Sequence, residues 1–109
     1  MLRLNIPTVS YAKQEVSLGG FKYDFVYSYN EYDGRWRIDI YYNEELIVPG
    51  LAIMEDSSII RFRYDVPEFS HGDLQCRKVL DTKESVGRNN LGIGKEYELI
   101  YFTNEELGL

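Results

Sequence analysis

The sequence predicts an all-β protein, built as a single small antiparallel β-sandwich or partly closed barrel of about seven or eight strands. The main observation is an alternation of apolar and polar residues over positions 21–42. Successive side chains of a strand point to opposite faces, so this alternation indicates one apolar and one solvated face. The Asp33-Gly34 step inside the segment predicts a tight turn, because glycine accepts the positive φ that such turns need. No segment shows sustained helical periodicity.

The apolar positions of this predicted hairpin share one parity on each strand, and we expect them to form one core. They are Phe21, Tyr23, Phe25, Tyr27, Trp36, Ile38 and Ile40. The chain has ten tyrosines, a residue type that suits half-buried strand positions. Tyrosine is also enriched at interfaces. For the alternating set, the core interpretation is favoured over an interaction surface.

Residues 1–13 precede the hairpin and are expected to form a short strand or an ordered tail. Pro7 ends the first apolar stretch of this segment. A strand follows at Gln14–Leu18, with Val16 and Leu18 directed inward. The Gly19-Gly20 pair then predicts a tight turn into the aromatic strand. We expect residues 14–102 to form the β-domain and residues 103–109 to form a C-terminal tail.

The second half of the chain is expected to add shorter strands between polar turns. A polar turn at 43–45 leads to a strand at 46–48, and Pro49-Gly50 is expected to break that strand before a further short one. The short strand that follows is expected at 51–54, and residues 55–58 could cap a short helix. A strand is expected at 59–64, with a helical turn as the alternative, and a loop at 65–73. Strands at 74–80 and 96–102, joined by a polar loop at 81–94, complete the series.

Size and charge limit the function. At 109 residues the chain is long enough for one domain with a core of its own. Its formal net charge is −6, and its basic residues are interleaved with acids, which argues against nucleic-acid binding. The acidity favours solubility or a basic partner. The first residues hold no apolar run of signal-peptide length, and no segment reaches the length of a membrane span. We therefore expect synthesis in the cytoplasm.

The residue types that carry chemistry are sparse. One histidine, His71, and one cysteine, Cys76, cannot build a zinc site, and the acidic residues show no calcium-loop spacing. Cys76 is interpreted as a small core residue of a strand. Ser70 and His71 are adjacent, but nothing marks a catalytic triad. Asp39 with Glu98 could in principle form an acid–base pair, although solvated strand-face charge is the favoured interpretation.

Three glycines in the late polar loop, Gly87, Gly92 and Gly94, have no helix after them, so a flexible loop is favoured over a phosphate cradle. The sequence thus predicts no catalytic, cofactor-binding or metal-binding residues and no cofactor. A binding module and a structural assembly part remain as classes of function.

Several motifs occur in one order along the chain. They are Leu18-Gly19-Gly20 with Tyr23, Tyr29-Asn30, Asp33-Gly34 with the strand Trp36–Ile40, the segment Leu46–Leu51, Gly72-Asp73-Leu74, and Arg88–Gly92 before Leu99-Ile100-Tyr101. The series resembles the small baseplate plug proteins of contractile-tailed bacteriophages, over about residues 14 to 102. Met1–Lys13 matches no motif of the series.

The resemblance implies a mainly β, non-enzymatic virion component in the tail baseplate, in contact with hub, tube or spike proteins. It supplies no catalytic residues, and Asn30 and Trp36 are interpreted as positions that define the fold. Several copies in a symmetric assembly are expected. The loops 65–73 and 81–94 are the candidates for partner contact, with solvated connections as the alternative.

Two other classes of function remain open. One is a small β-barrel that binds a ligand in a pocket lined by tyrosines. The other is a host-directed phage module that binds a basic protein. A filled aromatic core would favour the assembly part, and an open pocket would favour the ligand-binding barrel.

Overall fold

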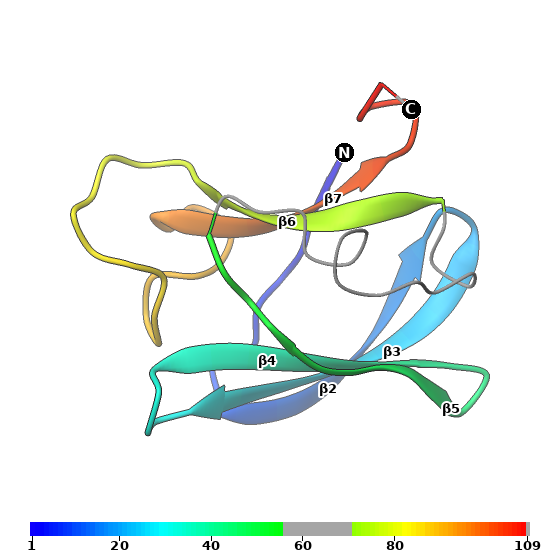
Figure 1. The fold of residues 1–109 in the computed structure, drawn as a ribbon, viewed down its shortest axis with the longest axis horizontal. Coiled ribbons are helices and arrows are strands. Elements are labelled where there is room, and N and C mark those ends of the chain that lie inside the picture. The colour runs from blue at the N-terminus through cyan, green and yellow to red at the C-terminus, as the bar shows by residue number, and fades with distance from the viewer. Residues whose placement is uncertain (56–70, 109) are drawn as a thin grey trace.

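The computed structural model describes residues 1–55 and 71–108. Within them the protein is all-β, with seven strands in two antiparallel sheets that face each other and do not close into a barrel (Figure 1). The strands are β1 (Leu2–Arg3), β2 (Tyr11–Leu18), β3 (Phe21–Asn30), β4 (Arg35–Tyr42), β5 (Glu45–Ala52), β6 (Gly72–Lys78) and β7 (Tyr97–Thr103). The predicted sandwich is confirmed.

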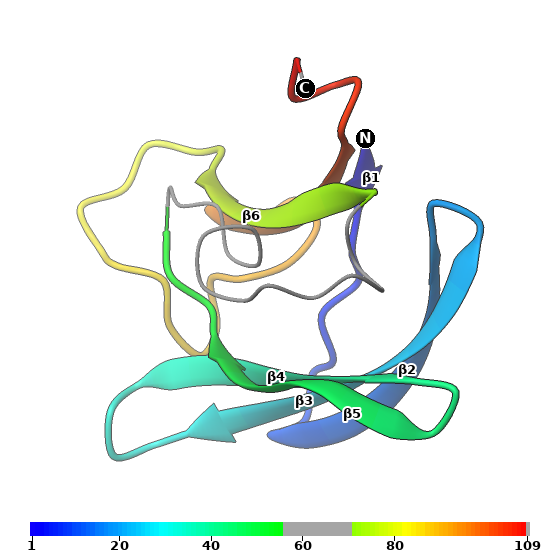
Figure 2. The ribbon, with the colours of Figure 1, turned by 45° about the vertical axis from the view of Figure 1, so that its right-hand side comes forward.

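The two sheets differ in how local their strand pairs are. The larger sheet has the order β2-β3-β4-β5 and is a meander of hairpins between consecutive strands. The smaller sheet has the order β1-β7-β6, so the first and last strands of the chain pair in it. Figure 2 shows the N-terminal segment descending from the smaller sheet to β2 in the larger one, and the two termini lying close together. The N-terminal amine forms an ion pair with Glu106.

The hairpins of the larger sheet follow from their turn residues. Gly19 and Gly20 both have positive φ, and they join β2 to β3 with Leu18 opposite Phe21. Asn43 and Glu44 adopt the same left-handed conformation between β4 and β5. Two consecutive residues of positive φ match the right-handed twist of a two-residue hairpin. Strand β2 begins three residues before the expected start, at Tyr11.

The expected break at Pro49-Gly50 is wrong. Strand β5 runs through both residues and absorbs them as shifts of register against β4, between Ile38 and Tyr41. Gly50 has positive φ, and its N–H donates to the Asp39 carboxylate at 2.6 Å. Proline is tolerated here because β5 is an edge strand, where a missing N–H leaves no neighbour unpaired.

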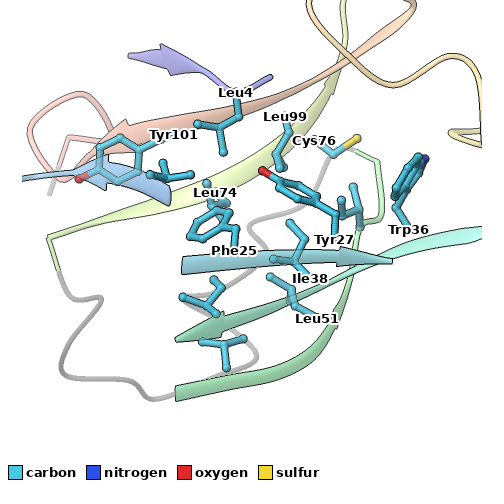
Figure 3. Close-up of a cluster of buried hydrophobic side chains, with 14 of the residues drawn as sticks. Leu4, Phe25, Tyr27, Trp36, Ile38, Leu51, Leu74, Cys76, Leu99 and Tyr101 are labelled. Atoms are coloured by element: carbon cyan, nitrogen blue, oxygen red, sulfur yellow. The ribbon is translucent and has the colours of Figure 1, made fainter. Parts of the chain in front are cut away.

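The core fills the space between the sheets, where side chains from both point at one another (Figure 3). Six of the seven residues expected on the core face of the hairpin are buried, including Trp36 at 2% exposure. Phe21 is the exception and is 43% exposed. It is the first residue of β3, at a corner of the sheet, where it stacks on His71 and meets the ring edge of Tyr42.

The smaller sheet contributes the opposite wall of the core. Leu74 and Cys76 of β6 and Leu99 of β7 are fully buried, which confirms Cys76 as a core residue. Strand β6 begins two residues before the expected start and ends at Lys78. Glu55 forms a parallel bridge with Cys76. The elements expected at 56–64 and most of the loop 65–73 lie outside the described residues.

Candidate interaction surfaces

One end of the sandwich is closed by the long loop between β6 and β7, residues 79–96, which lies over the β3–β4 turn (Figure 1). The indole N–H of Trp36 donates to the backbone oxygen of Gly87 in this loop at 3.1 Å. The Arg88 guanidinium lies over the rings of Tyr29 and Trp36, at 5.6 and 5.3 Å from their centroids. Leu91 of the same loop is buried in the hydrophobic core. We call this region the Trp36 end.

The loop 79–96 is held by its own hydrogen bonds. The Asn90 side chain accepts from the Gly87 N–H at 2.7 Å and donates to the Ser85 carbonyl oxygen at 2.9 Å. The Tyr97 hydroxyl donates to the Glu84 carbonyl oxygen at 2.7 Å. Arg88 also donates to the carbonyl oxygen of Thr8, which ties the loop to the N-terminal segment. A long loop fixed in this way is a built surface rather than a slack connection.

The three glycines of this loop do not form an anion cradle. The Gly87 N–H is bonded by Asn90, the Gly92 N–H donates to the Tyr97 carbonyl oxygen, and the Gly94 N–H donates to the Glu98 carboxylate at 3.0 Å. A phosphate-binding loop presents free backbone N–H groups to its ligand. All three N–H groups are committed inside the protein, which agrees with a structural role for these glycines.

The surface of the Trp36 end combines a groove with exposed apolar side chains. The groove has a volume of about 430 Å³ and is lined by residues of the β3–β4 turn (33–35), of the segment 53–55, and of the loop (Ser85 and Val86). Tyr32 at the turn is fully exposed. Val79, Leu80 and Ile93 on the loop are each exposed by more than two fifths. Apolar side chains exposed on ordered loops suit contact with another protein.

The opposite end of the sandwich is bridged by His71, which directly precedes β6. Its Nε2 atom lies 2.7 Å from the hydroxyl of Tyr23 on β3, and its Nδ1 atom lies 2.6 Å from the hydroxyl of Tyr101 on β7. In the neutral ring one nitrogen donates and the other accepts, so both contacts are satisfied. The ring stacks on Phe21 at 5.3 Å between centroids. We call this region the His71 end.

Two glycines make room for the His71 end. A Cβ added to Gly19 would lie 2.5 Å from the His71 ring, and Gly19 has a φ of +60°. A Cβ added to Gly72 would lie 2.3 Å from the backbone oxygen of Phe102 and 2.7 Å from the Tyr101 ring. These distances are too short for any side chain, so Gly19 leaves room for the His71 ring and Gly72 leaves room for the neighbouring strand β7.

The groups weighed for catalysis are placed apart. Asp39 lies on the outer face of the larger sheet, bonded to Gly50. Glu98 lies on the smaller sheet and is only 6% exposed, with the Arg3 guanidinium at 3.2 Å, so its interpretation as a solvated strand-face charge is wrong. Within the described residues, no group of three or more histidine, cysteine or acidic side chains is arranged to hold a metal ion. Ser70 lies outside the described residues.

Several ionisable groups have shifted pKa values that follow from packing. Partial burial lowers the pKa of His71 below its usual value. Burial raises the pKa of Tyr27 and, together with the nearby Glu106 charge, that of Tyr101. A hydrogen bond from Arg37 lowers the pKa of the Asp33 carboxyl. These shifts fit structural contacts, since the tyrosines remain neutral and bonded and the acid remains paired.

A family model described as the cyanophage baseplate Pam3 plug gp18 matches residues 1–105. The chain belongs to this baseplate plug family. The match confirms the resemblance seen in the sequence motifs, and it indicates a structural protein of the phage virion, located in the tail baseplate in association with other baseplate proteins. No curated protein matches the chain. Along the described residues, no helix is long and apolar enough to cross a membrane.

Some of the residues in the motifs that resemble the plug family lie at the two ends of the sandwich. Tyr29, Trp36 and Arg88 meet at the Trp36 end. At the other end Gly19 lies against the His71 ring, and Gly72 lies against Phe102 and Tyr101 of β7. Sequence reasoning missed the role of His71, which was weighed only as a ligand or a catalytic base. Its partners, Tyr23 and Tyr101, are distant in sequence, so no local pattern could identify the bridge.

Proposed function

We propose that this baseplate plug packs against hub, tube or spike proteins of a contractile-tailed phage, as a non-enzymatic part present in several copies. The match of the family model over residues 1–105 carries the proposal. It is further supported by the filled core, in which Tyr23, Tyr27, Tyr97 and Tyr101 are each exposed by 4% or less. Side chains packed in this way leave little room for a pocket lined by tyrosines.

We place the principal contact surface at the Trp36 end. Three of its exposed apolar side chains, Val79, Leu80 and Ile93, sit on a loop fixed by internal hydrogen bonds, so little conformational entropy is lost when a partner binds. The groove formed by the β3–β4 turn, the segment 53–55 and the loop is lined by both charged and apolar residues, which suits a mixed protein surface. The loop 65–73 remains a second candidate for partner contact.

The remaining parts of the proposal concern domain limits and cellular location. We propose residues 14–102 as the β-domain, residues 1–13 as an N-terminal segment and residues 103–109 as a tail, with synthesis in the host cytoplasm before assembly. The protein needs no cofactor for this role, because assembly rests on protein–protein contacts alone.

The test is incorporation into phage particles. Mass spectrometry of purified virions should detect the protein, and particles made with Leu80→Ser and Tyr32→Ser together should contain much less of it. Val9→Ser is the matched control, because Val9 is also an exposed apolar residue but lies on the N-terminal segment. Absence of the wild-type protein from intact particles would overturn the assignment and favour a host-directed binding module.

A further inference from the structure

The outer edge of strand β2 carries unused backbone hydrogen-bonding groups. In its pairing with β3 the even-numbered residues face the partner, as shown by the bond from the Tyr29 N–H to the Ser10 carbonyl oxygen and by the pairing of Leu18 with Phe21 across the turn. The N–H and C=O groups of the odd-numbered residues therefore point away from the sheet. These residues are Tyr11, Lys13, Glu15 and Ser17, and their side chains are exposed.

Among the described residues, no backbone group pairs with these outward N–H and C=O groups. The other strand edges are shorter or interrupted. Strand β5 is made irregular by register shifts against β4 around Pro49-Gly50, β1 has two residues, and β6 meets Glu55 at Cys76. An open edge of eight residues is a template for pairing with another strand.

The charges on this edge leave one group unmatched. Glu15 stands directly opposite Asp24 of β3, and like charges opposite each other on a sheet are destabilising. Lys13 compensates Asp24, with its Nζ atom 3.7 Å from the carboxylate. Within the described part of the chain, no cation lies within ion-pair distance of Glu15. The edge therefore offers a carboxylate that a cation from outside would stabilise.

From this edge we infer that two copies of the chain pair antiparallel through β2 about a two-fold axis at Gln14. In that register Lys13 of one copy stands opposite Glu15 of the other, twice, and Tyr11 stands opposite Ser17. The odd-numbered residues that point outward then form the hydrogen-bonded pairs. On the core face Ala12 of one copy stands opposite Val16 of the other. The pairing therefore sets opposite charges against each other on the outer face and apolar residues against each other on the core face.

The product is one continuous eight-stranded sheet made from two four-stranded ones. The interface is isologous, because the same residues on each copy contact each other. The Gln14 side chain does not obstruct it, since its amide is used within its own molecule, bonded to the Asn5 carbonyl oxygen and the Tyr27 hydroxyl. The pairing goes beyond the baseplate role and does not depend on it.

The test is the mass of the purified chain in solution, by sedimentation equilibrium, with a charge swap at the edge. The wild-type chain should sediment at twice its 12.8 kDa mass. Lys13→Glu and Glu15→Lys should each raise the dimer dissociation constant about tenfold or more, because each turns two attractive pairs into repulsive ones. The double variant restores opposite charges in the same register, so it should dimerise again. Circular dichroism should show that each variant is folded.

Lys83→Glu and Glu31→Lys are the matched controls, because they make the same charge changes at exposed sites away from β2. They should leave the dimer unchanged. The inference is wrong if the wild-type chain stays monomeric at millimolar concentration, or if the swap fails to restore a dimer lost in the single variants. It is also wrong if the edge variants abolish binding of a different baseplate protein while the chain alone is a monomer.

A disulfide tests the register directly. Residues on the two-fold axis form a non-hydrogen-bonded pair about 4.5 Å apart between Cα atoms, within the range of a disulfide. Gln14→Cys should therefore give a covalent dimer on mild oxidation. Ala12→Cys should not, because its partner is Val16. Native Cys76 is buried and is kept in both variants. Equal crosslinking of the two variants would overturn the register.

Discussion

The two ends of the sandwich are closed by different chemistry. At the Trp36 end a long loop covers an indole, and a guanidinium lies over two aromatic rings. At the His71 end one imidazole joins a tyrosine of each sheet through its two nitrogens. The first closure depends on apolar area and on a cation that stays charged at all ordinary pH values. The second depends on an imidazole, whose pKa is lowered by partial burial. The ends should therefore differ in how much stability they contribute and in how they respond to pH.

The largest effect is expected from Trp36→Ala. The side chain is 2% exposed and packs against Tyr29 and the loop, so its removal should lower the free energy of unfolding by about 3–5 kcal/mol. Urea unfolding measures the change. Trp36→Phe is the control, because it keeps most of the apolar area and loses only the bond to Gly87. Equal losses for the two variants would show that ring burial is not what holds this end.

The next effect is expected at the His71 end from Gly72→Ala. The added Cβ would lie 2.3 Å from the Phe102 backbone oxygen, so the two strands must separate, and the free energy of unfolding should fall by about 1–3 kcal/mol. At the Trp36 end, Gly87→Ala is the matched control, because the nearest atom to its Cβ would be 3.9 Å away. The control should change stability by less than about 0.5 kcal/mol. A comparable loss at both positions would contradict the close approach at Gly72.

These two ends also show what the sequence could predict. Alternation predicted the buried faces of β3 and β4, because the period of a strand is local. It failed at Phe21, because alternation indicates the face but not how far the opposing sheet extends over it. Residue propensity predicts a break at Pro49-Gly50, but it does not reveal that an edge strand can absorb both residues as a bulge. The pairings of Trp36 with Gly87 and of His71 with Tyr23 join residues about fifty positions apart, and no local signal encodes them.

A smaller effect is expected from Arg88→Gln at the Trp36 end. The guanidinium lies over the rings of Tyr29 and Trp36 and donates to the Thr8 carbonyl oxygen. Loss of its cation–π contacts should lower the free energy of unfolding by about 0.5–1 kcal/mol. Arg35→Gln, at an exposed position on the same end, is the control and should have little effect. If both substitutions cost the same, net charge rather than ring contact explains the loss.

The smallest effect is a dependence on pH that only the His71 end should show. Partial burial lowers the pKa of His71 in the folded state below its unfolded value of about 6.5. The folded state therefore favours the neutral ring, and this contribution is present above the unfolded pKa and is lost as the pH falls through the folded pKa.

Urea unfolding at about pH 7.5 and about pH 5.5 measures this contribution. Between the two pH values the free energy of unfolding should fall more for the wild-type protein than for His71→Gln, whose side chain forms hydrogen bonds but does not titrate. Asp33 and Glu106 have lowered pKa values and are present in both proteins, so their titration cancels in the difference. Trp36→Phe should keep the wild-type pH dependence, because the substitution leaves the His71 bridge at the other end intact. An identical loss in His71→Gln and the wild-type protein would show that the His71 bridge does not sense pH.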